Sequence, residues 1–266
     1  MRLALRLSYL GDRFLGSQQQ TEERTVEGEV IAACRRLELF SDWREARFCF
    51  AGRTDRGVHA RGQVCAFDTP VPDRAQEALS LQLPRDIWCT GIARVPGEFH
   101  PRHDARSRTY RYLFPDLDLD TAAMDRAAGS FVGRFDYSRF GRVEGKNPER
   151  VVLAARVFRE EGFPVFEVTA WSFLWQMVRS MAGVLEAVGR GEAGGERIRE
   201  LLAEPSGPRV PPAPAEGLIL WDVDCGITFQ ELAIDHRSRD SLAFLWRHHA
   251  LMARICRVLQ ERTAEP

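Results

Sequence analysis

A single carboxylate lies in a short, glycine-bounded run between two segments that are typical of strands. The run reads Ala51-Gly52-Arg53-Thr54-Asp55-Arg56-Gly57-Val58-His59-Ala60-Arg61. Glycine lets the backbone approach a ligand closely, and an aspartate in such a turn can act as a nucleophile or as a base. An ordinary hairpin with a solvated Asp55 explains the same residues, because Asp and Gly are common in turns. The residue types alone leave both interpretations open.

The elements that must position this run follow from the spacing of apolar residues. Leu3, Leu5 and Leu7 alternate as in a strand, and Thr25 fits the N-cap of a helix. Further strands are predicted at 47–51, 62–69, 87–95, 105–114, 150–159, 165–171 and 218–223. Further helices are predicted at 73–83, 121–132, 174–189 and 196–202. The order repeats weakly, which indicates two similar α+β halves with antiparallel or mixed sheets.

Composition limits the class of protein. The 266 residues, 44% of them hydrophobic, suit one large or two modest domains. No uninterrupted apolar stretch is long enough to span a membrane, and the alternating N-terminus is typical of a strand rather than a signal peptide. We therefore expect a cytoplasmic protein without a membrane segment. The 6 cysteines form no C-x-x-C pair, which predicts reduced thiols. His100 and His103 lack further ligands, so no metal site is expected.

The charge is balanced overall but uneven along the chain. A formal net charge of −1 is unexpected for a protein that binds nucleic acid. Residues 100–112, however, carry four arginines against one aspartate, and residues 134–150 carry five basic side chains against three acidic ones. These segments predict a local basic surface, and arginine suits phosphate because its planar head offers several donors.

Six segments, taken in order, resemble the tRNA pseudouridine synthase A (TruA) family over about residues 3–225. The segment 52–64 that contains Asp55 resembles the signature of this family. The other matches are Tyr9-Leu10-Gly11 with Phe14, Gly16, Gln18 and Gln20; Leu83-Pro84-Arg85-Asp86-Ile87; Phe99-His100-Pro101-Arg102 with Tyr110-Arg111-Tyr112; 173–179; and 213–218. Arg56, after the aspartate, is more similar to archaeal or eukaryotic members than to bacterial ones.

The resemblance implies an α+β fold of two related domains whose sheets lie side by side around a basic cleft. We expect an N-terminal domain at 1–104, which carries the Asp55 loop, and a C-terminal domain at 105–226, which completes the active site. It also implies a homodimer in which one subunit holds the tRNA body while the other modifies it.

The resemblance further implies roles for four residues. Asp55 falls on the catalytic aspartate, and Arg53 on the arginine that fills the space left by a flipped nucleotide. Tyr110 matches the tyrosine that packs against the target base, and Arg179 the arginine that pairs with the aspartate. The plainer alternatives are a surface ion pair for Arg53, a buried position in a strand for Tyr110 and an exposed position on a helix for Arg179.

Further residues are candidates for contact with the substrate. Leu218 or Leu220 could form the apolar wall beside the uracil. The candidates for RNA contact are Phe14, Gln18, Gln20, Arg56, His59, Arg61, Arg102, Arg106 and Arg108. Phosphate contacts of this kind position the RNA and make its binding sensitive to salt. Phe14 could equally be a core residue, and each basic side chain could be a solvated surface charge.

The function implied is the isomerisation of uridine to pseudouridine in the anticodon stem-loop of tRNA, at positions 38–40, without a metal or redox cofactor. A non-catalytic RNA-binding protein on the same fold is an alternative from another class. The joint presence of Asp55, Arg53, Tyr110 and Arg179 argues against it. A nucleoside hydrolase that uses Asp55 and His59 is a third possibility, and it predicts free uracil as a product.

Residues 227–266 extend beyond the usual end of the family. Leu242, Leu245, His249, Met252, Cys256 and Leu259 recur at spacings of three and four. Such a seam predicts a helix that docks on the body of the protein. The alternatives are contact with a second subunit and contact with RNA. The arginines of the segment keep the contact with RNA open.

Overall fold

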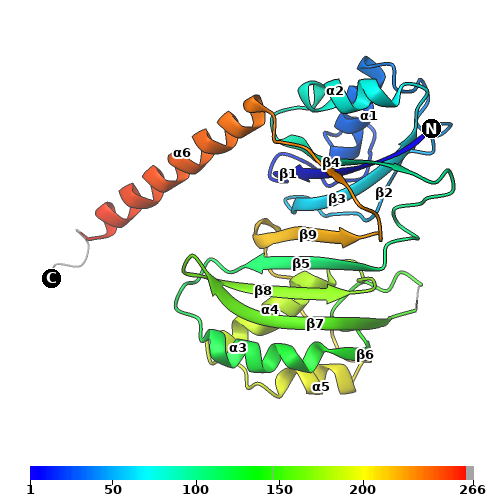
Figure 1. Ribbon diagram of the computed structural model, residues 1–266. Helices are drawn as coiled ribbons and strands as arrows, with labels where there is room; N and C mark the ends of the chain where they lie inside the picture. The colour runs from blue at the N-terminus through cyan, green and yellow to red at the C-terminus, as the bar shows by residue number, and fades with distance from the viewer. Residues whose placement is uncertain (146, 262–266) are drawn as a thin grey trace.

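The computed structural model describes residues 1–145 and 147–261. The end of the predicted C-terminal segment and Lys146 of the basic segment 134–150 therefore lie outside the described residues. Within them the chain is a mixed α+β protein built on one large sheet (Figure 1).

Ten strands form this sheet, and it runs through both halves of the chain. The strands of the first half are β1 (Arg2–Tyr9), β2 (Cys49–Phe50), β3 (His59–Asp68) and β4 (Ile87–Val95). Those of the second half are β5 (Ser107–Leu113), β6 (Gly133–Asp136), β7 (Glu149–Glu160), β8 (Phe163–Ala170) and β9 (Leu218–Asp224). The short β10 (Gln230–Glu231) pairs with β4, which makes the order β10-β4-β1-β3-β9-β5-β8-β7-β6, with β2 beside β3. The expected mixed sheet is confirmed.

The two halves meet at a short parallel pairing in the middle of the sheet. His59 and Ala60 of β3 pair with Ile219 and Leu220 of β9, whereas the other described strand pairs are antiparallel. The backbone hydrogen bonds therefore make one continuous sheet. The division into domains at 1–104 and 105–226 stays a prediction.

Helices cover the sheet on the side away from the viewer of Figure 1. The first half contributes α1 (Val26–Arg36) and α2 (Pro72–Gln82). The second half contributes α3 (Thr121–Ala128), α4 (Met177–Gly189), α5 (Arg197–Ala203) and the 3₁₀ turns η1 (Gly129–Phe131) and η2 (Ala215–Gly217). The N-cap predicted at Thr25 is confirmed, because its hydroxyl accepts a hydrogen bond of 3.2 Å from the amide of Gly28.

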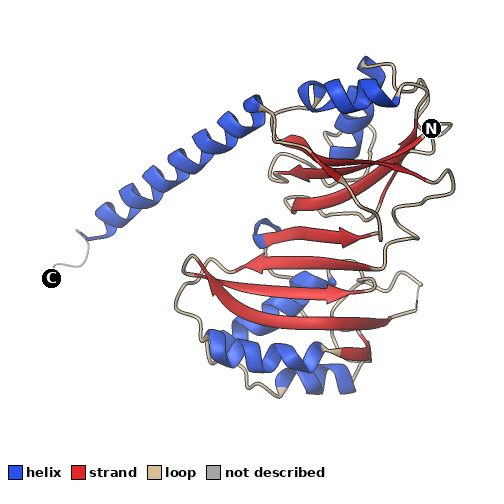
Figure 2. Cartoon of the chain, viewed as in Figure 1, coloured by secondary structure: helices blue, strands red, loops and turns tan. Residues whose placement is uncertain are grey.

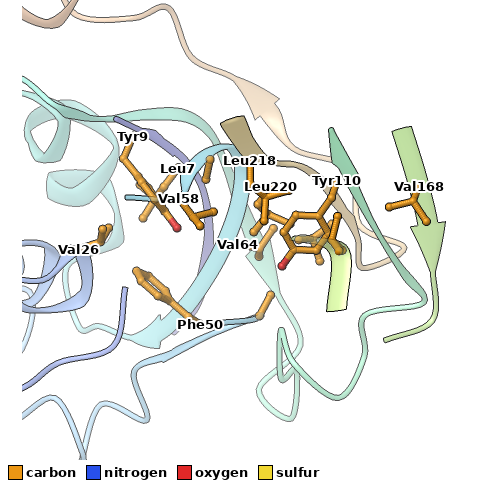
Figure 3. Packing of buried hydrophobic residues seen from close by; sticks show 14 of the residues in the cluster. Leu7, Tyr9, Val26, Phe50, Val58, Val64, Tyr110, Val168, Leu218 and Leu220 are labelled. Atoms are coloured by element: carbon orange, nitrogen blue, oxygen red, sulfur yellow. The ribbon is translucent and has the colours of Figure 1, made fainter. Parts of the chain in front are cut away.

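One hydrophobic core extends across the junction of the two halves. It is a single cluster of buried residues that includes Leu7, Val58, Tyr110 and Leu220. Figure 3 shows these side chains side by side around β3, β9 and β5. Burial of apolar surface is the dominant favourable contribution to folding, so the junction is held by the same core that holds each half.

The C-terminal helix leaves the body of the protein, contrary to prediction. α6 (His236–Glu261) projects from the edge of the sheet with no other element alongside it (Figure 2). Phe244 and Trp246 are 63% and 72% exposed, and Leu251 and Leu259 are exposed as well. The prediction that this helix docks on its own chain is therefore wrong. The apolar spacing correctly predicts a helix, but spacing does not specify what covers an apolar face.

Removal of α6 tests how little it contributes to the body. We expect a chain that ends at Asp235 to lose less than about 1 kcal/mol of unfolding free energy. The reason is that Ser238 is the buried residue of the described helix, and Arg237 reaches the body through a hydrogen bond to the carbonyl of Leu81. Urea unfolding at low protein concentration measures the change. A loss of several kcal/mol would mean that the helix packs on the body after all.

Candidate active site

The Asp55 loop is tied to the opening segment of the chain on the covered side of the sheet. Thr54 is buried, its amide donates to the Ser17 hydroxyl at 2.8 Å, and its own hydroxyl lies 2.8 Å from that of Tyr9. Gly57 has a φ of +82°, a conformation that side chains disfavour. The glycine and the two polar contacts hold Asp55 in a defined turn between β2 and β3.

Both oxygens of Asp55 have a partner. Arg179 Nη1 lies 3.1 Å from Oδ2, which forms the ion pair that the sequence led us to expect. The indole nitrogen Nε1 of Trp175 donates to Oδ1 at 2.7 Å. The side chains of Arg179 and Asp55 are 15% and 25% exposed, so the pair is largely shielded from solvent while the carboxylate stays accessible.

Arg179 is fixed independently of Asp55. It lies in the first turn of α4, and its Nε donates to the carbonyl of Ala213 at 2.7 Å. The residue before the helix, Gln176, has a φ of +66°, which is uncommon for a residue with a side chain. This local turn brings Trp175 and Arg179, four positions apart, to the same carboxylate. Trp175 lies within the segment 173–179 that resembles the family, but no role at the site was predicted for it.

Tyr110 and the two candidate leucines form an apolar wall beside the loop. Tyr110 pairs with Leu220 across β5 and β9, and its ring meets that of Phe173 edge-on at 5.2 Å. Leu218 and Leu220 are 6% and 0% exposed. Burial raises the pKa of Tyr110 far above its ordinary value, with smaller contributions from Tyr9 and from Asp55. Tyr110 is therefore neutral, and Figure 3 shows its ring with the hydroxyl oxygen at the far edge.

The arginines of the loop lie at its rim. Arg53 and Arg56 are both exposed, as are Gln18, Arg102 and Arg106. Arg53 is near enough to Glu27 to oppose the rise in pKa that burial gives that carboxyl. Gln20 is also exposed, and its amide bonds to the carbonyl of Leu15 at 2.9 Å. These side chains are placed where RNA could reach them.

Phe14 is a core residue rather than an RNA contact. It is 1% exposed, packs edge-on against Tyr9 at 6.5 Å between ring centres, and is covered by the guanidinium of Arg24 at 4.2 Å. A side chain so completely enclosed cannot touch a bound nucleic acid. The prediction that it contacts RNA is wrong, and its plainer alternative holds.

Arg108 holds the scaffold together. Its guanidinium donates to three backbone carbonyls, those of Ala51 at 2.9 Å, Arg102 at 3.0 Å and Trp171 at 2.9 Å. These bonds join the segment before the Asp55 loop to two segments of the second half of the chain. Three of the five N–H donors of the guanidinium are thus used within the protein, and the phosphate contact of Arg108 stays a prediction.

Arg61 does not line the Asp55 site. Ala60 pairs with Leu220 on the face that carries Tyr110, so the next side chain along β3 faces the other way. There the guanidinium of Arg61 lies 4.4 Å from the ring centre of Trp221, in a groove of about 440 Å³ that Arg6 and Trp88 also line. Both β3 and β9 have a register shift at this point, as in a β-bulge.

His59 links two loops as a neutral imidazole. Its Nδ1 accepts from the amide of Gly11 at 3.0 Å, and its Nε2 lies 3.2 Å from the carbonyl of Glu216. Burial lowers its pKa from the ordinary value of 6.5, against weaker opposing effects of Asp12 and Glu216. With both nitrogens engaged, His59 is not free for the phosphate contact predicted from the sequence.

The lowered pKa of His59 predicts a loss of stability in acid. In the unfolded chain His59 binds its proton at a higher pH than in the folded chain. The contribution of His59 to the unfolding free energy is therefore full above about pH 6.5 and is lost as the pH drops through the pKa of the folded state. We expect the unfolding free energy of the wild type to fall more between pH 7 and pH 5 than that of His59→Asn, which retains an acceptor for Gly11. Urea titrations at each pH measure the difference, and parallel curves would contradict it.

Two absences hold for the described residues. Residues 1–145 and 147–261 contain no group of three or more His, Cys, Asp or Glu side chains that could hold a metal ion. No helix in the same ranges is long and apolar enough to cross a membrane.

Comparison with known proteins defines the class of this site. Residues 127–224 match the family model described as tRNA pseudouridine synthase. The chain is thus an isomerase of the pseudouridine synthase class, with a carboxylate held by an arginine at the centre of a mixed sheet.

Curated relatives specify the family. The chain is 57% identical to tRNA pseudouridine synthase A of Methanoculleus marisnigri, over 100% of this chain and 98% of the relative. It is 54% identical to that of Methanosphaerula palustris (97% and 92% covered) and 42% identical to that of Thermococcus onnurineus (86% and 87% covered). The protein belongs to the tRNA pseudouridine synthase A family. A crystal structure of a Cbf5-Nop10-Gar1 complex aligns at a TM-score of 0.37 and 13% identity over 70% of this chain and 54% of that chain, too little to establish a common fold.

Proposed function

We propose that this protein converts uridine to pseudouridine at positions 38–40 of the tRNA anticodon stem-loop, with Asp55 as the catalytic carboxylate. The observation that carries the proposal is the Asp55 carboxylate, held by Arg179 and Trp175 and still 25% exposed beside an apolar wall. Family membership supplies the reaction and the tRNA.

The reaction exchanges one bond of the ribose for another. The bond between C1′ and N1 of uracil breaks, the base turns, and C1′ bonds to C5; C5 gives up its proton and N1 takes one up. The isomerisation is redox-neutral, so no oxidant or reductant enters. A carboxylate assists by attacking C1′ or C6 of uracil, or by removing a ribose proton.

The base must leave its stack to reach the carboxylate. We assign Arg53, which is exposed at the rim, to the space that the flipped nucleotide leaves. Tyr110 and Leu218, which are 9% and 6% exposed, are assigned to the apolar pocket that confines the detached uracil, whereas Leu220 is fully enclosed and packs beneath the surface. We assign the contacts with the RNA around the flipped base, in a basic cleft, to Arg56, Gln18, Gln20, Arg102 and Arg106.

Tritium release from tRNA labelled at C5 of uracil tests the proposal. We expect release by the wild type, none by Asp55→Ala, and no free uracil. Free uracil would indicate a hydrolase, and no release by folded wild type that binds tRNA would indicate a non-catalytic RNA-binding protein. Mapping of pseudouridine along the product tRNA then tests the assignment to positions 38–40.

We also propose a homodimer in the cytoplasm, in which one subunit holds the tRNA body for the other. One support is the resemblance to the family, which implies such a dimer. The other is the size of tRNA, which residues remote from one Asp55 loop would be needed to hold. Sedimentation equilibrium tests it: a chain of 30.2 kDa would sediment at about twice that mass. A species of 30.2 kDa that retains full activity would contradict the dimer.

A further inference from the structure

Two of the acceptor positions of the Asp55 carboxylate are occupied, one on each oxygen. Oδ1 accepts from Trp175 Nε1 at 2.7 Å and Oδ2 from Arg179 Nη1 at 3.1 Å. An ionised carboxylate has about four such positions, so each oxygen keeps one for a reacting atom. The two donors restrain the carboxylate but leave an acceptor position open on each oxygen.

The second donor is needed because one contact does not orient a carboxylate. The last torsion of an aspartate, between an sp³ and an sp² carbon, is broad and roughly two-fold. With Arg179 alone on Oδ2, the plane of the carboxyl group of Asp55 could rotate about that contact. A donor on the other oxygen removes this freedom, and the indole N–H is such a donor.

Trp175 is itself held from the opposite side by Arg142. The backbone amide of Arg142 donates to the carbonyl of Trp175 at 2.9 Å, and its guanidinium carbon lies 4.3 Å from the centre of the indole ring. Gly141 permits this close approach, because a Cβ there would lie 2.4 Å from the Cβ of Leu174. The indole is thus fixed although it is 42% exposed.

We propose that Trp175 is a positioning residue for catalysis: its indole N–H sets the plane of the Asp55 carboxylate, and Arg142 sets the indole. The inference rests on the proposed function, in which Asp55 is the catalytic group. It assigns a role to Trp175 through Asp55, without contact with the reacting atoms. A misplacement of about 1 Å in such a group is enough to slow a reaction substantially.

The nuclear magnetic resonance spectrum of the protein labelled with ¹⁵N-tryptophan tests the contact without reference to activity. The chain has 6 tryptophans, and Trp175→Phe identifies the indole signal of Trp175. We expect this N–H proton downfield of exposed indoles, and a large upfield shift in Asp55→Ala. The signal of Trp171, which is 52% exposed on the same segment, serves as the internal control and should stay in place. An unmoved Trp175 signal in Asp55→Ala overturns the inference.

Kinetics of the full chain test the consequence. We expect Trp175→Phe, which keeps a ring for Arg142 to cover but loses the donor, to lower kcat about tenfold with KM for tRNA changed less than twofold. The matched control Trp171→Phe should leave both constants unchanged. Arg142→Gln, which frees the indole without touching Asp55, should lower kcat by a smaller factor.

The outcomes separate the two proposals. Activity in Asp55→Ala would refute the proposed function. An inactive Asp55→Ala together with a Trp175→Phe variant that is folded and as fast as the wild type would refute the positioning role alone. An equal loss of kcat in Trp175→Phe and Trp171→Phe would also refute it, because the effect would then come from the exposed aromatic surface and not from the bond to Asp55.

Discussion

Asp55→Asn is expected to lower kcat for pseudouridine formation by a factor on the order of 10⁴ or more, as is found when a residue that reacts directly is replaced. Asparagine keeps the shape of the side chain and can still accept from Trp175, but it has no negative charge for Arg179 and is a poor nucleophile and base. The carboxylate itself, and not the packing of the loop, is therefore what the substitution removes. Single-turnover tritium release from C5-labelled tRNA measures the effect.

Two controls accompany this measurement. Asp86→Asn removes a carboxylate that is likewise bound by an arginine, Arg24, at 2.8 Å, but that lies outside the loop of Asp55. It should leave kcat within about twofold of the wild type. The affinity of Asp55→Asn for tRNA should remain, since the arginines of the rim are intact. A variant that binds tRNA and turns over at more than a tenth of the wild-type rate would show that Asp55 is not the catalytic group.

Arg179→Gln is expected to affect both activity and stability. It removes the charged partner of Oδ2 and the donor to the Ala213 carbonyl in one change. The pair is largely but not fully buried, so we expect a loss of about 1–3 kcal/mol of unfolding free energy, below the value for fully buried pairs. We expect kcat to fall about 10²–10³-fold, since the carboxylate loses one of its two restraints and its counter-charge.

The matched control for Arg179 is Arg190, at the other end of α4. Arg190 also bonds to carboxylates, those of Asp116 at 3.2 Å and Glu186 at 2.6 Å, but it lies about 16 Å along the helix from Arg179. Arg190→Gln should leave kcat unchanged and cost less than about 1 kcal/mol. If both variants lost activity equally, the loss at Arg179 would come from the helix rather than from Asp55.

Most of the fold follows from local patterns in the sequence. The alternation of Leu3, Leu5 and Leu7 gives β1, and Thr25 marks the start of α1, because these signals depend on neighbours in the chain. The face of a strand at an irregularity does not follow from such patterns. Arg61 lies at a bulge beside another at Trp221, and only the pairing of β3 with β9 decides which way it points.

The roles of site residues could be predicted where a sequence motif indicates them. They could not be predicted where tertiary contacts determine which partner a side chain binds. The contact between Arg179 and Asp55 was expected from the resemblance to the family, and the structure contains it. Trp175 was missed although it lies four residues before Arg179, because an indole has no charge to indicate a partner. His59 and Arg108 were interpreted as free donors, but the folded chain uses them to bind its own carbonyls.

The parallel pairing of β3 with β9 has a consequence for how the protein acquires activity. His59 and Ile219 are 160 positions apart, so this contact closes a very long loop of chain. Contacts of such long range form late, because the entropy of loop closure precedes any gain from them. During synthesis the Asp55 loop would thus be complete long before β9 and its leucines emerged. Catalytic competence should arrive in one step near the end of folding, with no partly active nascent form to act on tRNA.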